Sequence, residues 1–208
     1  MKDKILRILA TTASVIFHPL LLPTYGFTLI AVFNMLGLET EGSWVYYAVA
    51  VAGTFIFTFI IPISLILILR HQKRVSSIRL DNQQERSIPY IYAFVAFAIW
   101  CYFIRRIMHI EAIVFLLCCA ATISIGIVAL INMRWKISAH LTGMGCFIGG
   151  VLIMTSMNGT LSNMLIIGLF LIALILTYSR LYLKSHTPLQ VTMGLILGLS
   201  MSLLTLLI

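Results

Sequence analysis

The stretch SRLYLKSHTPLQ, residues 179–190, gathers polar and cationic side chains between two runs that are almost pure hydrocarbon. The two apolar runs cover residues 137–178 and 191–208. A helix needs about 20 apolar residues to cross a bilayer, so the first of these runs is too long for one crossing. The segment SMNGTLSN at 156–163 has the turn chemistry that divides it into two helices. Residues 179–190 therefore lie at a membrane surface, between two spans.

The rest of the chain has the same character. Further uncharged apolar runs cover residues 8–38, 44–69, 88–104 and 112–133, and the 208 residues are 61% hydrophobic and 10% charged, with a mean hydropathy of +1.08. This composition excludes a soluble globular protein. We predict an all-α, polytopic membrane helical bundle of six or seven transmembrane helices, forming one domain over residues 1–208. The net charge of +8 indicates anionic lipid headgroups and phosphate as partners, rather than nucleic acid.

Two features of the sequence have a structural interpretation. The segment FHPLLLP at 17–23 carries two prolines that interrupt backbone hydrogen bonding, which predicts a short interfacial helix leading into one span, with His18 as a kink residue rather than a ligand. A cleaved signal peptide fits poorly, because the apolar stretch is too long and no small-x-small site closes it. The four cysteines lie inside predicted spans without metal-type spacing, so we interpret them as packing residues.

Three polar clusters are related by parity. They cover residues 70–89, 134–140 and 179–190, and two crossings separate each from the next, so all three must emerge on the same face of the membrane. All of the 14 Lys and Arg residues except Arg105 and Arg106 lie on that face or in the N-terminal segment before the first run. The positive-inside rule then predicts that the clusters face the cytoplasm. We expect an integral multi-pass protein of a bacterial inner membrane.

The clusters bring together groups suited to phosphate. They supply guanidinium groups, hydroxyls and imidazoles from Arg79, Arg86, Arg180, Ser138, Ser179, His140 and His186. Guanidinium groups donate paired hydrogen bonds to phosphoryl oxygens, and backbone donors of a helix beginning after Ser138 would add to them. One imidazole could attack phosphorus while the other, protonated, donates to the departing alkoxide. This chemistry requires no metal and no cofactor.

A simpler interpretation exists for each piece. Lys and Arg beside a span are commonly interfacial anchors, and a histidine at a span end is commonly a hydrogen-bonded structural residue. Lys73, Arg74 and Lys184 fit the anchoring role. The joint spacing of the other residues favours a site.

That spacing resembles the type 2 phosphatidic acid phosphatase superfamily, which also contains the vanadium haloperoxidases. Its three motifs are Lys, six residues, Arg-Pro; then PSGH; then Ser-Arg, five residues, His, three residues, Asp. Here RLDNQQERSIP (79–89) places six residues between Arg79 and Arg86, ISAH (137–140) supplies Ser138 and His140, and SRLYLKSHTPLQ (179–190) reproduces the third spacing with Gln190 at its end. The motifs span 112 residues in family order.

The resemblance implies a fold, an activity and roles. It implies a membrane-embedded phosphatase that acts on a lipid or polyprenyl (pyro)phosphate, such as phosphatidic acid, phosphatidylglycerophosphate or undecaprenyl pyrophosphate, through a phosphohistidine. His186 would be the nucleophile and His140 the general acid. The phosphate would be held by Arg79, Arg86, Ser138, the backbone of Ala139, Ser179 and Arg180.

The sequence departs from the family at several positions. Arg79 replaces Lys and keeps the charge, Ser87 replaces Pro, and Ile137 and Ala139 replace Pro and Gly. Gln190 stands where the family has an Asp that orients and stabilises the nucleophilic imidazole. In triad enzymes the corresponding amide substitution costs about 10⁴ in rate. We therefore expect a slow or specialised phosphatase; the alternatives are a catalytically inactive lipid-phosphate binder or transporter and a structural membrane subunit.

The glycine and aromatic residues predict how the helices pack and where the membrane interfaces lie. Gly145 with Gly149, and Gly194 with Gly198, have the spacing that lets two helices approach closely. Tyrosine and tryptophan near the span ends, including Trp44, Tyr90 and Trp135, are typical of an interfacial aromatic belt.

Overall fold

The computed structural model describes residues 2–37, 43–77, 80, 82–157, 159 and 163–208. Its helices are α1 (Lys2–Ile16), α2 (Leu22–Val32), α3 (Ser43–Phe55), α4 (Ile61–His71), α5 (Ser87–Arg106), α6 (Ala112–Asn132), α7 (Ala139–Met157), α8 (Asn163–Tyr182) and α9 (Pro188–Leu203). A π-helical turn, Ile56–Ile60, joins α3 to α4, and 3-10 turns precede α5 (Gln84–Arg86) and follow α9 (Leu204–Leu207). The predicted all-α bundle is confirmed.

Six segments are long and apolar enough to cross a membrane within the described residues. They are Ser43–His71, Gln84–Arg106, Ala112–Asn132, Ala139–Met157, Asn163–Tyr182 and Pro188–Leu207. The chain is thus an integral multi-pass membrane protein. Helix α2, with 11 residues, is apolar but shorter than a span, so the predicted seventh crossing is divided between α1 and α2.

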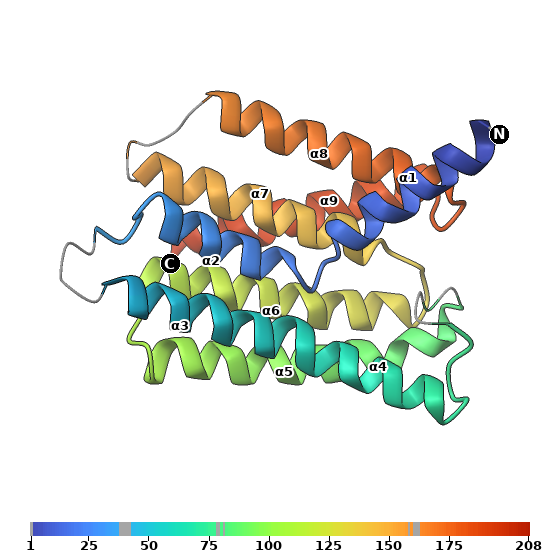
Figure 1. The fold of residues 1–208 in the computed structure, drawn as a ribbon, viewed down its shortest axis with the longest axis horizontal. Helices are drawn as coiled ribbons and strands as arrows, with labels where there is room; N and C mark the ends of the chain where they lie inside the picture. Colours follow the sequence, from blue (N-terminus) through green and yellow to red (C-terminus); the bar gives the residue numbers. More distant parts are fainter. Residues whose placement is uncertain (1, 38–42, 78–79, 81, 158, 160–162) are drawn as a thin grey trace.

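The connections alternate between the two ends of the bundle (Figure 1). The last turns of α4, α6 and α8 lie at one end, together with the first turns of α1, α5, α7 and α9, whereas the last turns of α2, α5 and α7 lie at the other end with the first turns of α3, α6 and α8. The three polar clusters follow α4, α6 and α8, so they all lie at the first of these ends. The predicted parity of the clusters is confirmed.

The chain bends sharply between α1 and α2. Pro19 lies in this break and Pro23 in the first turn of α2, because a proline has no N–H to continue a helix but fits a helix start. The carbonyls released by the bend find side-chain donors: the Tyr25 hydroxyl donates to Ile16 O at 2.8 Å, and Thr58 Oγ1 donates to Leu20 O at 3.0 Å. Such compensation is required inside a membrane, where water does not supply the missing bonds.

A glycine seam joins α7 to α9. A Cβ on Gly194 would lie 2.6 Å from the carbonyl oxygen of Ser138, and one on Gly149 would lie 2.6 Å from Cβ of Ser202. A Cβ on Gly145 or Gly198 would clash with the backbone of the opposite helix. The predicted close approach is confirmed, and it sets the start of α7 directly beside the start of α9.

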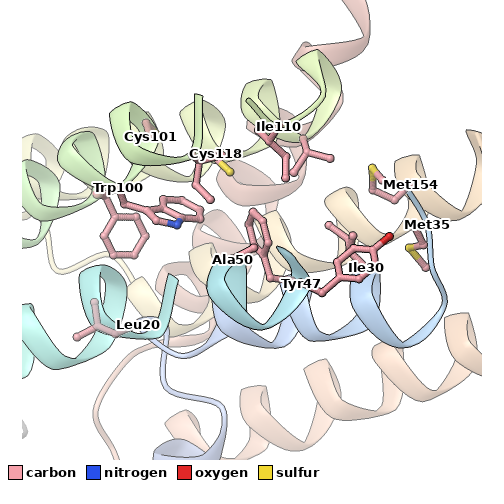
Figure 2. Packing of buried hydrophobic residues seen from close by; sticks show 14 of the residues in the cluster. Leu20, Ile30, Met35, Tyr47, Ala50, Trp100, Cys101, Ile110, Cys118 and Met154 are labelled. Atoms are coloured by element: carbon pink, nitrogen blue, oxygen red, sulfur yellow. The ribbon is translucent and has the colours of Figure 1, made fainter. Parts of the chain in front are cut away.

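One hydrophobic core is formed mainly by residues of α2, α3, α5 and α6. Figure 2 shows Trp100 and Cys118 close together there, and the Trp100 indole donates to Thr54 Oγ1 at 2.9 Å. Cys101 and Cys118 are buried among apolar neighbours in this core, which agrees with the packing role predicted for them.

Candidate active site

The connection from α8 to α9 positions the third cluster. The N–H of Ser185 donates to Arg180 O at 3.1 Å and the N–H of Lys184 to Leu181 O at 2.9 Å, with Lys184 in the left-handed region at φ 51°. These two bonds form a Schellman motif, which ends α8 and reverses the chain. Three residues later α9 begins, so the turn holds His186 between two helix ends.

A capping box starts α9. Thr187 Oγ1 accepts from the N–H of Gln190 at 3.4 Å, and Gln190 Oε1 accepts from the N–H of Thr187 at 3.1 Å. Glutamine is a preferred residue at this third helical position, because its side chain reaches back to the first orphan N–H of the helix. The amide oxygen of Gln190 is therefore oriented toward the turn.

The same oxygen reaches the predicted nucleophile. Nδ1 of His186 lies 3.3 Å from Gln190 Oε1 and 3.1 Å from the carbonyl oxygen of Lys136. Both neighbours are acceptors, so Nδ1 carries the ring proton and donates to them, and Nε2 keeps its lone pair. Gln190 and Lys136 together fix the tautomer that a nucleophilic imidazole requires.

The charge state of His186 follows from its surroundings. Its side chain is 8% exposed, and burial, followed by the charges of Arg180 and Arg86, lowers its pKa from 6.5 to about 3. The ring is therefore neutral near pH 7. Both cations, Arg86 and Arg180, thus act electrostatically on the same imidazole.

Arg86 is held at the entrance of α5. Gln83 and Asn132 exchange hydrogen bonds, from Gln83 Nε2 to Asn132 O at 2.6 Å and from Asn132 Nδ2 to Gln83 O at 3.1 Å, which fastens the α4–α5 connection to the end of α6. Arg86 is 4% exposed, and its Nε donates to Leu80 O at 2.7 Å. Its guanidinium group also interacts electrostatically with Tyr90, one helical turn later. Both groups are neutral, and a buried cation held by neutral groups favours an anionic partner.

His140 and Arg180 converge on Ser14 of α1. His140 Nε2 donates to the carbonyl oxygen of Ser14 at 3.1 Å, and Arg180 Nη1 donates to the Ser14 hydroxyl at 3.3 Å. Electrostatic interactions further connect His140 with Arg180 and His186. The carbonyl and hydroxyl oxygens of Ser14 thus accept hydrogen bonds from a histidine and an arginine of the predicted site.

His18 is part of this cluster. Its ring lies edge-on to that of His140, with centroids 5.3 Å apart and planes at 79°, and its Nδ1 accepts from the N–H of Leu20 at 3.4 Å. The residue does lie at the predicted kink. It also packs against one of the two motif histidines, which the interpretation as a kink residue did not anticipate.

The remaining predicted residues have other roles in this structure. Ser138 is fully buried and caps α7, where its Oγ accepts from the N–H of Leu141 at 3.5 Å, while its own N–H donates to Gln190 O at 3.3 Å. Ala139 begins α7. Ser179 Oγ donates to Ile175 O within α8 at 2.7 Å, so its proton is not directed at a ligand. Arg79 lies outside the described residues.

Sequence reasoning missed Ser14 and assigned Tyr90 to the aromatic belt. Ser14 has no local pattern that marks it, since it meets its partners across more than 120 residues of sequence. Tyr90 carries a signal that could have been used, because it lies four residues after Arg86 and therefore on the same helical face.

Within the described ranges, no group of three His, Cys, Asp or Glu side chains gathers as a metal site would require. Comparison with protein-family models, curated proteins and solved structures finds no match to this chain.

Proposed function

We propose that the chain is a membrane phosphatase of the type 2 phosphatidic acid phosphatase superfamily, which hydrolyses a lipid or polyprenyl (pyro)phosphate. The observation that carries the proposal is the setting of His186: a neutral imidazole whose Nδ1 proton is fixed by two oxygen acceptors, with two arginines in electrostatic range. Burial in a six-span bundle favours a substrate that already resides in the membrane.

The first chemical step is transfer to the nucleophile. Nε2 of His186 attacks phosphorus, the bond from phosphorus to the leaving oxygen breaks, and that oxygen takes a proton from His140, which holds this proton while the phosphate anion lies beside its ring. Arg86 and Arg180 neutralise the charge on the phosphoryl oxygens. The proton stays on Nδ1, which donates to Gln190 Oε1 and to the carbonyl oxygen of Lys136, so the positive ring of the phosphohistidine is stabilised.

The second step regenerates the site. Neutral His140 takes a proton from water, the resulting hydroxide attacks phosphorus, and the bond to Nε2 of His186 breaks. Inorganic phosphate leaves, with His140 protonated for the next cycle. Donation to a leaving group requires a nitrogen of His140, and Nε2 is engaged by Ser14; the proton therefore travels through Nδ1, or Ser14 gives way when substrate binds.

A substrate panel tests the proposal. Purified protein in nanodiscs is given phosphatidic acid, phosphatidylglycerophosphate and undecaprenyl pyrophosphate, and phosphate release is measured. We expect release from at least one, abolished in His186→Gln and retained in His71→Gln, which changes an exposed histidine at the same end of the bundle. A labelled phosphoryl group should be trapped on the protein as an acid-labile, base-stable adduct.

The binding alternative predicts a different result. Gln190 is neutral where the family has a carboxylate, and a protein that lost turnover there would still bind vanadate or phosphate through Arg86 and Arg180. Vanadate binding without release from any substrate would replace the phosphatase by a lipid-phosphate binder. Phosphate release that persists in His186→Gln would contradict the phosphatase mechanism, and the absence of vanadate binding to the parent protein would contradict the binder.

A further inference from the structure

An apolar cavity of about 150 Å³ lies between α2 on one side and α5, α6 and α7 on the others. It forms because α2 packs against α3 and α7 while α5 packs against α6, and because small residues face the gap between these pairs. Gly26, Ala121, Gly143 and Gly150 are among the residues that line it.

The cavity follows the length of the bundle. Its lining along α7 runs from Ala139 to Met154, which at 1.5 Å per helical residue is about 22 Å. Trp100, Cys118 and Met154, drawn in Figure 2, belong to this lining. A small volume spread over such a length gives a narrow shape, suited to one extended chain.

The walls are almost entirely hydrocarbon. The polar side chains among them are engaged within the protein: Thr142 Oγ1 donates to Ser138 O at 3.1 Å and Ser124 Oγ to Ala120 O at 2.7 Å. An apolar cavity of this volume stays dry and takes up apolar ligands as large as benzene. Water is therefore a poor occupant, whereas a hydrocarbon segment is a good one.

One end of the cavity meets the candidate active site. Tyr90, which interacts electrostatically with Arg86, and Ala139, which precedes His140, both belong to the lining. An amphiphile with its phosphoryl group among Arg86, His140 and His186 would therefore have its chain aligned with the cavity. No other polar cluster described above adjoins the lining.

We propose that this cavity is the binding site for one hydrocarbon chain of a lipid phosphate, whose phosphoryl group lies at Arg86. The inference rests on the proposed function only for the location of that group. The ligand chemistry is a long hydrocarbon chain on a phosphate, which either a polyprenyl phosphate or phosphatidic acid could supply.

Filling the cavity tests the inference. A Cβ on Gly150 would meet Leu117 at 3.8 Å, an ordinary contact, so Gly150→Leu adds its remaining carbons to the cavity. Gly168→Leu is the matched control, because a Cβ there meets nothing within 4 Å and α8 does not line the cavity. Thermal unfolding of both variants in detergent verifies that they fold.

Binding is measured without turnover. Trp100 is 1% exposed and lines the cavity, so in a Trp44→Phe, Trp135→Phe background its fluorescence reports a quencher that enters. Nanodiscs of unbrominated lipid receive brominated polyprenyl phosphate in one arm, brominated phosphatidic acid in a second and brominated neutral diacylglycerol in a third. A Trp44-only variant, whose tryptophan is exposed, monitors partition into the bilayer.

We expect saturable quenching of Trp100 by at least one brominated phosphate, with an apparent affinity at least tenfold lower in Gly150→Leu and unchanged in Gly168→Leu. The brominated phosphate that quenches Trp100 identifies the class of lipid whose hydrocarbon chain is bound. Equal quenching by the neutral lipid, no quenching, or no effect of Gly150→Leu would each overturn the inference.

The two proposals fail separately. Quenching with this pattern but no phosphate release from any substrate keeps the chain site and rejects the phosphatase. Phosphate release from a long-chain substrate that Gly150→Leu leaves unchanged keeps the phosphatase and rejects the chain site.

Discussion

The amide oxygen of Gln190 lies 3.3 Å from Nδ1 of His186 while accepting the N–H of Thr187 at 3.1 Å. One oxygen therefore caps α9 and orients the imidazole. Gln190 is suited to this double role because its longer side chain satisfies the capping box, which favours glutamine or glutamate. An Asp there would be one methylene shorter.

Removing this oxygen should slow the reaction only moderately. In Gln190→Leu the Lys136 carbonyl still accepts the Nδ1 proton, so the tautomer persists and the loss corresponds to one hydrogen bond, about 1 kcal/mol, or roughly fivefold in the rate of phosphate release. Gln190→Glu should keep the capping box and raise the rate about tenfold, since its charge stabilises the positive ring. An unchanged rate in both variants would remove Gln190 from the catalytic group.

The pKa of His186 predicts a pH dependence of stability. The unfolded chain binds a proton on this ring near pH 6.5, whereas the folded chain does so only near pH 3. The contribution of the neutral ring is therefore complete above pH 6.5 and is lost as the pH falls from 6.5 toward 3, by about 1 kcal/mol per pH unit. Thermal unfolding between pH 7 and pH 4.5 should decline less steeply in His186→Gln than in the parent, with His71→Gln as the control. Parallel curves would contradict the neutral ring.

The glycine seam should be sensitive to a single methyl group. A Cβ at Gly194 would lie 2.6 Å from Ser138 O, so Gly194→Ala must separate α9 from α7 and shift His186 relative to His140. A displacement of about 1 Å at reacting groups can cost 10²-fold in rate. In Gly168→Ala, with open space around it, stability should instead rise by up to about 1 kcal/mol through helix propensity. Melting temperature and phosphate release measure both effects, and opposite signs are expected.

The hydroxyl of Ser14 should compete with anions for Arg180. Ser14→Ala removes a hydrogen bond of 3.3 Å, so vanadate should bind roughly fivefold more tightly, as expected for about 1 kcal/mol. Isothermal titration in detergent measures this affinity. Weaker binding would instead place Ser14 among the groups that hold the anion.

Ser179 provides the opposite expectation. Because its hydroxyl donates to Ile175 O within α8, Ser179→Ala should change vanadate affinity and phosphate release by less than about twofold, the effect of a few tenths of a kcal/mol. A loss of tenfold or more would show that Ser179 turns toward the ligand during the reaction.

The arrangement of the polar clusters could be predicted from the sequence because each membrane crossing reverses the side on which the chain emerges. The apolar runs predicted six or seven crossings, and six segments within the described residues are long enough to span. The glycine spacing indicated the seam between α7 and α9. The spacing within 179–190 was informative because Arg180 and His186 belong to one short connection, whose geometry is local.

The contacts of α1 could not be predicted in the same way. Ser14 and His18 meet Arg180 and His140 through tertiary packing, and neither residue type nor spacing marks such a meeting. The sequence T-x-x-Q indicates the capping role of Gln190. The prediction instead treated Gln190 as a substitution of the Asp in the third motif that loses a charge. The cavity depends on how four helices diverge, which apolar periodicity does not encode.

Ser14 has one more consequence, for selectivity among solutes. Its two oxygens compete with any phosphate for the donors of His140 and Arg180. Because they belong to the same chain, they act at an effective concentration on the order of millimolar. Under the proposed function, free inorganic phosphate must displace the Ser14 oxygens through the contacts of its own oxygens alone. Under the proposed function, a lipid phosphate also gains the binding energy of its hydrocarbon chain, so the site would favour a lipid phosphate over dissolved inorganic phosphate.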